Sequence, residues 1–411
     1  MRAALIPRCV LLFALLLSQA PGALAARHKG PAPADAAPAA SSRPDADTLL
    51  LGVYRELAGN HLRAAMEQAD ALVAAYPNFH LGHLVRGDLL LLQARAARPL
   101  DKLPPASQER LQSLRQEAGA RMRALLERPD PKLVPSVLVQ MRPDQKVAFV
   151  VDARRSRLYV YENEGGTPRF VADYYISQGK LGVYKLKEGD QRTPLGVYTV
   201  TSRLAGQKLP DFYGSGALPI SYPNEWDRLS GRSGSGIWLH GVPSDSYSRP
   251  PLSSDGCVVL TNADLLRLSQ AAEVGKTPVV IAPELSFITH EKLEVQRRQA
   301  QALFESWRRD LESRDPARVG SHYSSKFKSE AAQGDAQSWI ARQASWLGRL
   351  RQPSVSLRDQ SVFRYPGESE MLVTSFTQEA RVNGRVAQSR RVRQYWSLEG
   401  QVWRIVAENV W

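Results

Sequence analysis

The spacing of apolar residues changes twice along the chain and divides it into three structured regions. In the first region, apolar residues recur at helical intervals from residue 48 to about 97 and again from 108 to 127. This spacing is typical of amphipathic helices that bury one face. We therefore expect an accessory helical domain over residues 48–130.

Between residues 146 and 284 the pattern is that of short strands. Two runs of β-branched and aromatic residues, 147–151 and 158–161, flank a polar turn, which predicts a β-hairpin. The sequence predicts a mostly β domain with one helix. Further strands are expected at 170–177, 196–202, 236–240 and 278–282, and the helix at 263–272.

The last region begins with helices and ends with long strands, an order that describes an α+β layer in which the sheet curls around the helices. Residues 288–411 resemble in this respect the cone-shaped domain of the nuclear transport factor two (NTF2) superfamily. The predicted fold class is therefore multidomain α+β. The helices are expected at 287–312 and 337–349, and the strands at 354–363, 370–382, 390–398 and 402–410.

The N-terminus has the features of an export signal. Arg2 and Arg8 precede an apolar run over residues 10–17, and Ala23-Leu24-Ala25 supplies the small residues of a signal-peptidase site. We expect a signal peptide over residues 1–25 and a mature protein in the periplasm or cell envelope. The run is shorter than the roughly 20 residues of a spanning helix, so the mature chain is not expected to span a membrane.

Composition narrows the classes of partner. The 411 residues include 54 Lys and Arg against 41 Asp and Glu, a net charge of +13, which suits an anionic polymer. For an exported protein this favours envelope polymers and excludes nucleic acid. Residues 26–47 are rich in Ala, Pro and Ser and poor in large apolar residues, so we expect a disordered linker there.

One cysteine and one histidine, Cys257 and His240, fall within residues 146–284. Gly241 follows the histidine, and its carbonyl is available to orient one ring nitrogen. Gly256 precedes the cysteine and lets the amides of Gly256 and Cys257 converge near the sulfur. We expect His240 to accept the thiol proton and the thiolate to attack a carbonyl, with these amides holding the oxyanion.

The alternatives for these two residues are a core histidine with an inert buried cysteine, or a metal site. One cysteine and one histidine are fewer than the three or four ligands that zinc needs, so neither a metal nor another cofactor is expected. Signal cleavage would remove Cys9 and leave Cys257 as the only thiol, which excludes an internal disulfide. A single thiol and a single imidazole, each beside a glycine, favour catalysis.

The phrase His240-Gly241, a spacer and Ser254-x-Gly256-Cys257 resembles the signature of L,D-transpeptidases of the YkuD type. Two upstream phrases, at 189–198 and 222–224, extend the resemblance. It implies a β-rich fold in which Cys257 is the nucleophile, His240 the general base and Gly241 the residue that orients the base. Gly256 would be an oxyanion donor. The substrate-binding residues that we expect are Ser254, Asp255, Tyr222 and Asn224.

The same resemblance implies peptidoglycan stem tetrapeptides as substrate. In this family the cysteine attacks the carbonyl of the third stem residue, expels the terminal D-alanine and passes the acyl group to an amine. A hydrolase, in which water replaces the amine and releases wall-bound lipoprotein or trims stem peptides, fits the same residues. A non-catalytic wall-binding module is the third interpretation.

Asp255 departs from the family pattern, which usually has histidine directly before the Gly-Cys pair. An ionised carboxylate so close to the sulfur disfavours the thiolate. Our hypothesis is that Asp255 instead contacts a cationic acceptor amine.

The helical domain offers a second kind of partner. Its spacing of Gly, Ala and Pro resembles a tetratricopeptide unit, which would bind an envelope protein, although a packed helical cap explains the same spacing. The domain order that we expect is a signal peptide (1–25), a disordered linker (26–47), a helical domain (48–130), a YkuD-like catalytic domain (146–284) and an NTF2-like domain (288–411).

Overall fold

The computed structural model of the protein describes residues 44–94, 104–329, 336–348, 350–368 and 370–411. The expected signal peptide, Cys9 and residues 26–43 of the expected linker lie outside these ranges. Residues 44–411 form one compact unit. Among the described helices, none combines the length and the apolar character needed to cross a membrane.

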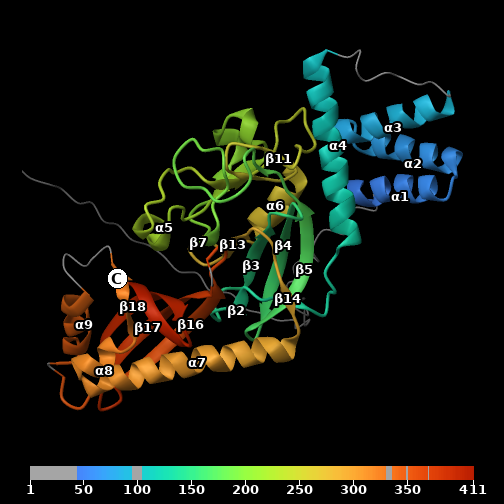
Figure 1. Ribbon diagram of the computed structural model, residues 1–411. Helices are drawn as coiled ribbons and strands as arrows, with labels where there is room; N and C mark the ends of the chain where they lie inside the picture. Colours follow the sequence, from blue (N-terminus) through green and yellow to red (C-terminus); the bar gives the residue numbers. More distant parts are fainter. Residues whose placement is uncertain (1–43, 95–103, 330–335, 349, 369) are drawn as a thin grey trace, which may run out of the picture. The chain divides into compact units, whose positions relative to one another are not determined.

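Four helices open the described chain, as the helical periodicity predicted. Asp45 caps the first of them by accepting a hydrogen bond from the Thr48 amide at 2.9 Å. This helix begins at Ala46, so Ala46 and Asp47 belong to it and not to a linker. Figure 1 shows the first three helices side by side, packed through a common apolar core. The helices are α1 (Ala46–Ala58), α2 (Leu62–Ala75), α3 (His80–Gln93) and α4 (Pro105–Leu126).

The mostly β region is built on a five-stranded sheet of order β5-β4-β3-β13-β7. Strands β3 and β4 form the predicted antiparallel hairpin, and β13 runs parallel to β3. Every residue of β3 is buried because its side chains alternate between two cores, with Phe149 in one and Val150 in the other. The strands are β3 (Val147–Asp152), β4 (Arg157–Glu164), β5 (Thr167–Tyr175), β7 (Gly196–Thr199) and β13 (Pro278–Ala282).

A smaller sheet of order β12-β10-β9-β8 packs against the core that contains Phe149. The edge strand β12 runs parallel to β10, whereas β9 runs antiparallel to it. The strands are β8 (Leu204–Ala205), β9 (Gly216–Pro219), β10 (Trp238–His240) and β12 (Val258–Val259). Two short strands, β6 (Gln178–Gly179) and β11 (Leu252–Ser254), pair beside it, and α5 (Glu225–Leu229) and α6 (Asn262–Ala271) complete the region.

The C-terminal region is α+β, as predicted. Figure 1 shows the long helix α7 lying along the twisted sheet, and Trp307 of α7 packs on Phe376 with ring centroids 5.6 Å apart. The helices are α7 (His290–Ser313), α8 (Pro316–Gly320) and α9 (Ala336–Ser345). The strands are β15 (Tyr323–Lys328), β16 (Ser354–Arg364), β17 (Met371–Val382), β18 (Arg385–Glu399) and β19 (Val402–Val410).

The segment before the mostly β region joins it to the C-terminal sheet. Strand β2 (Leu138–Gln140) pairs with β16 and becomes the edge strand of the order β15-β19-β18-β17-β16-β2. Strand β1 (Val134–Pro135) pairs with β14 (Phe287–Ile288) at the start of the C-terminal region. The mostly β and C-terminal regions therefore share a hydrophobic core as well as strand pairing.

Candidate active site

Cys257 and His240 lie at the ends of two adjacent strands of the smaller sheet. His240 ends β10, and Cys257 directly precedes β12, with His240 opposite Val259 in the parallel register. These short strands are held in place because Leu239 and Val258 are fully buried in the core. The fold thus brings together two residues that are far apart in sequence.

The His240 ring is buried and oriented by its neighbour. Its Nδ1 lies 2.7 Å from the Gly241 carbonyl oxygen, so the Nδ1 proton is donated to that carbonyl and Nε2 is left as the basic nitrogen. Gly241 therefore has the position that its predicted role requires. Burial lowers the pKa of His240 to about 4, and the positive charge of Arg249 acts in the same direction. The imidazole is neutral at physiological pH.

The Cys257 thiol is also uncharged in this state. Its Sγ donates a hydrogen bond to the Gly236 carbonyl at 3.4 Å, and burial raises its pKa, although the Trp238 amide opposes this. In the described part of the chain no hydrogen bond joins Sγ to the His240 ring. Proton transfer between them requires the thiol to turn away from Gly236.

Ser254 braces the turn that presents the cysteine. Its hydroxyl donates to the Cys257 carbonyl at 2.6 Å and accepts from the Gly256 amide at 3.1 Å. Ser254 is buried, and its hydroxyl both donates and accepts a hydrogen bond within the turn, which is a bracing role. That Ser254 also binds substrate stays a prediction.

In this structure the Gly256 amide donates to the Ser254 hydroxyl, and its expected role as an oxyanion donor stays a prediction. The Cys257 amide has no hydrogen-bond partner among the described residues and remains available. Glycine is required at 256 for another reason: its φ is +131°, and a Cβ there would lie 2.8 Å from the Arg192 carbonyl oxygen.

Asp255 lies on the exposed side of this turn. Its carboxylate accepts hydrogen bonds from Lys180 Nζ at 3.0 Å and Gln191 Nε2 at 3.3 Å. After burial, its negative charge is a further cause that raises the pKa of the Cys257 thiol, in the direction that the sequence predicted. Lys180 offsets part of this charge.

Tyr222 and Asn224 are buried, and their polar atoms are used inside the fold. The Tyr222 hydroxyl donates to the Ser233 carbonyl at 2.8 Å. Asn224 caps α5 by accepting from the Asp227 amide at 2.8 Å, and its Nδ2 donates to the Tyr365 hydroxyl at 2.9 Å. That these two residues also bind substrate stays a prediction.

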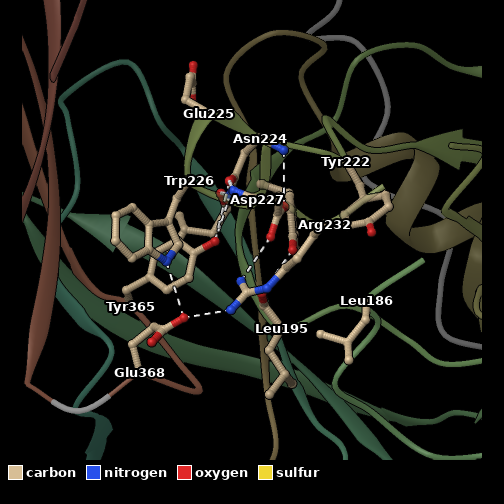
Figure 2. A network of polar contacts seen from close by, with 12 residues as sticks. Leu186, Leu195, Tyr222, Asn224, Glu225, Trp226, Asp227, Arg232, Tyr365 and Glu368 are labelled. Atoms are coloured by element: carbon tan, nitrogen blue, oxygen red, sulfur yellow. Dashed lines mark hydrogen bonds and ion pairs between the residues drawn. The ribbon is translucent and has the colours of Figure 1, made fainter. Parts of the chain in front are cut away.

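Figure 2 shows what the segment around Asn224 does instead. Arg232 bridges Asp227 at 3.1 Å and Glu368 at 2.6 Å, and Trp226 donates to Glu368 at 3.2 Å. Glu368 and Tyr365 belong to the C-terminal region, so this network fastens that region to the chain that leads into β10. The sequence carries no local signal for it, because the partners lie more than 130 positions apart.

Sequence reasoning also missed the aromatic and cationic groups around the imidazole. Tyr213 and Phe212 pack against His240 with ring centroids 5.1 and 5.6 Å away, and the Arg249 guanidinium lies 4.3 Å from the centre of the Phe212 ring. Phe212 and Tyr213 belong to a three-residue 3₁₀ helix (Asp211–Tyr213), and Arg249 lies in a loop, so hydrophobic periodicity gives no signal for any of them. No group of three or more potential metal ligands occurs within the described residues.

Comparison with known proteins identifies two domains. Residues 146–281 match the family model of the YkuD L,D-transpeptidase catalytic domain, and residues 299–409 match that of the Cds6 C-terminal NTF2-like domain. No curated protein matches the chain.

Two solved structures are each similar to about two thirds of the chain. The protein is similar to Bd1075 from Bdellovibrio bacteriovorus, with 25% identity over 68% of this chain and 98% of that one, at a TM-score of 0.59. It also shares the fold of the helical cell shape determining protein Pgp2 from Campylobacter jejuni, with 23% identity over 67% of this chain and 95% of that one, at a TM-score of 0.57.

Proposed function

Because residues 146–281 form an L,D-transpeptidase catalytic domain of the YkuD type, we propose that the protein is a cysteine acyltransferase acting on peptidoglycan stem tetrapeptides. The observation that carries the proposal is the placement of His240 at the end of β10 and of Cys257 directly before the adjacent parallel strand β12, with the Gly241 carbonyl orienting the imidazole. Arrangements of this kind activate a thiol through a neighbouring base.

In the first half-reaction, Nε2 of His240 takes the thiol proton while Sγ of Cys257 attacks the carbonyl of the third stem residue. A C–S bond forms, and the Cys257 amide donates to the oxyanion. The bond to the D-alanine nitrogen then breaks, and the imidazolium returns its proton to that leaving amine. The acyl group is left on the sulfur.

In the second half-reaction, a neutral acceptor amine attacks the thioester carbonyl and gives a proton to His240. The C–S bond then breaks, and the imidazolium returns this proton to Sγ of Cys257. Asp255 is exposed at the edge of the nucleophile turn and is paired with Lys180, so it can exchange this partner for the ammonium group of an arriving acceptor. If water takes the place of the amine, the same acyl-enzyme yields a trimmed stem peptide or a released lipoprotein.

The setting that we propose is the cell envelope. Residues 1–25 would direct export, and the net charge of +13 suits the anionic polymers there. One structural relative is a determinant of helical cell shape, which supports a role in cell shape for this protein. The helical domain contacts Tyr247 of the same chain through its core, and an envelope protein as a further partner of these helices stays a prediction.

The test is to incubate the mature protein with tetrapeptide muropeptides and to follow both protein and products by intact mass. We expect an acyl adduct on Cys257 and released D-alanine, and neither with Cys257→Ala. A dimeric muropeptide would identify transfer, whereas a tripeptide alone would identify hydrolysis. No adduct and no product would overturn the proposal in favour of a wall-binding module.

A further inference from the structure

A half-buried cation without a counter-ion lies beside the reacting groups. The Arg249 guanidinium stacks on Phe212, 4.3 Å from the ring centre, and its Nη2 reaches the Phe212 carbonyl only at 3.5 Å. Among the described residues, no carboxylate lies within ion-pair distance of it, and the negative charge of Asp255 acts on it only from further away. A guanidinium that is partly removed from water and unpaired is costly, which makes this position favourable for an anion.

Arg249 is close enough to the chemistry for such an anion to be part of the substrate. Phe212, on which it stacks, also packs on His240 with ring centroids 5.6 Å apart and an interplanar angle of 34°. Burial lowers the pKa of His240 and raises that of Cys257. The positive charge of Arg249 acts to lower the pKa of both groups. The guanidinium therefore acts on both reacting groups without contacting either.

The loop that carries Arg249 is held in place by its neighbours. The Tyr175 hydroxyl donates to the Arg249 carbonyl at 2.9 Å, and the Ser248 hydroxyl donates to Glu117 of α4 at 2.7 Å. The Tyr247 ring packs between Tyr76 and Phe79, with centroids 5.0 and 4.9 Å away. A guanidinium held in this way loses little freedom when it binds a ligand.

We propose that Arg249 binds a free carboxylate of the stem peptide and thereby determines which stems react. The guanidinium fork matches a carboxylate through two parallel hydrogen bonds. The inference rests on the proposed function of the Cys257 site. Two sources offer this chemistry: the carboxylate of the terminal D-alanine, one carbon from the scissile nitrogen, and the second carboxylate of the diamino acid at the third position.

Three synthetic tetrapeptides separate these sources. One carries both free carboxylates, one ends in D-alaninamide, and one has the second carboxylate of the diamino acid converted to a carboxamide. We expect wild-type kcat/KM to be roughly 10- to 100-fold lower for the peptide that lacks the carboxylate bound by Arg249, since a charge-assisted bidentate contact is lost. The amide peptide with the lower kcat/KM identifies which of the two carboxylates Arg249 binds.

The variants are Arg249→Gln and Arg249→Lys, with Arg169→Gln as the matched control. Arg169 lies on β5, is half exposed and pairs with Glu162 and Glu164 of the neighbouring strand. Arg249→Gln should lose the discrimination, Arg249→Lys should keep part of it, and the control should behave as wild type. If Arg249→Gln slows all three peptides equally, or none of them, the carboxylate assignment is overturned.

Binding to the Cys257→Ala protein, measured by calorimetry, keeps this inference separate from the proposed reaction. One outcome is that Arg249→Gln weakens binding of the free acid to the Cys257→Ala protein while wild type turns over no peptide. That result would support the carboxylate site and contradict the proposed enzymatic reaction. The other outcome is that wild type turns over the free acid and both amides with equal kcat/KM. That result would support the proposed reaction and contradict the carboxylate site.

Discussion

Burial sets the protonation of both reacting groups at the active site. It lowers the pKa of His240 to about 4 and raises that of the Cys257 thiol, whose proton is held by the Gly236 carbonyl. The resting pair is therefore a neutral imidazole and a neutral thiol, and not an ion pair. The nucleophile is generated only when the thiol leaves Gly236 and reaches the imidazole.

The buried imidazole should make stability depend on pH. The pKa of His240 is about 4 in the folded protein against an ordinary value of 6.5, so between these values the unfolded chain binds a proton that the folded chain does not. The free energy of unfolding should thus fall as pH falls from 6.5 to 4. His240→Asn removes this dependence, which amounts to about 2 to 3 kcal/mol at pH 4.5.

Denaturant unfolding of wild type and His240→Asn at pH 7.5 and pH 4.5 measures the effect. His80→Asn, at an exposed position of α3, is the matched control and should follow wild type. If the free energy of unfolding falls by the same amount between pH 7.5 and pH 4.5 in wild type and in His240→Asn, the imidazole is not buried in its neutral form.

At the scale of elements, one partly buried carboxylate connects the N-terminal helices to the catalytic domain. Asp47 of α1 accepts from Arg121 of α4 at 2.5 Å and from Arg157 of β4 at 2.8 Å. Arg121 also stacks on Tyr175 of β5, 3.8 Å from the ring centre. Although burial acts to raise the pKa of Asp47, the two guanidinium groups hold it below its ordinary value.

Asp47→Asn should therefore be strongly destabilising, because it leaves two largely buried guanidinium groups without their common anion. We expect a loss of about 3 kcal/mol in the free energy of unfolding. Since α4 also holds Ser248, amide hydrogen exchange of residues 243–251 should become faster. Asp45→Asn is the control: it changes the same group two positions away, where asparagine caps a helix as well as aspartate. Similar effects from both substitutions would contradict the assignment.

At the scale of the whole molecule, the catalytic and NTF2-like domains are joined by packing as well as by the chain. Trp226 of α5 stacks on Tyr395 of β18 with ring centroids 5.7 Å apart. Glu225 accepts from Arg393 Nη1 at 3.1 Å and from the Tyr395 hydroxyl at 2.9 Å. Strands β2 and β16 extend the contact. Residues of both domains therefore complete one core.

This shared core predicts that the two domains unfold together. Glu225→Gln leaves Arg393 without its anion and should lower the free energy of unfolding by about 1 to 3 kcal/mol, shifting the transitions of both domains equally. Glu294→Gln, which removes a half-exposed partner of Arg297, should cost less than about 0.5 kcal/mol. Differential scanning calorimetry, with tryptophan fluorescence as a second probe, measures both. Two separate transitions, of which Glu225→Gln moves only one, would contradict a shared core.

Most of the fold could be predicted because it follows from local pattern. Helical spacing marks α1 to α4, alternation marks the β3–β4 hairpin, and helices followed by long strands mark the C-terminal domain. The errors lie where pattern is weak. Asp47 was assigned to the linker because the residues before it have linker composition, although it belongs to α1. Strand β2 was missed in the Pro-containing stretch before residue 146, because pairing with a strand more than 200 positions away has no local signature.

The sequence by itself determined the candidate chemistry: a lone thiol and a lone imidazole, each beside a glycine, in phrases typical of one catalytic family. Only the tertiary structure decided that the Gly256 amide is engaged by Ser254, that Asn224 supports the contact with the C-terminal region, and that Arg249 stacks on a ring that packs against the imidazole. The physical reason is that residue type states what a side chain can donate, accept or bury. Which of these capacities is left free for a substrate depends on partners that only the folded chain brings within hydrogen-bond distance.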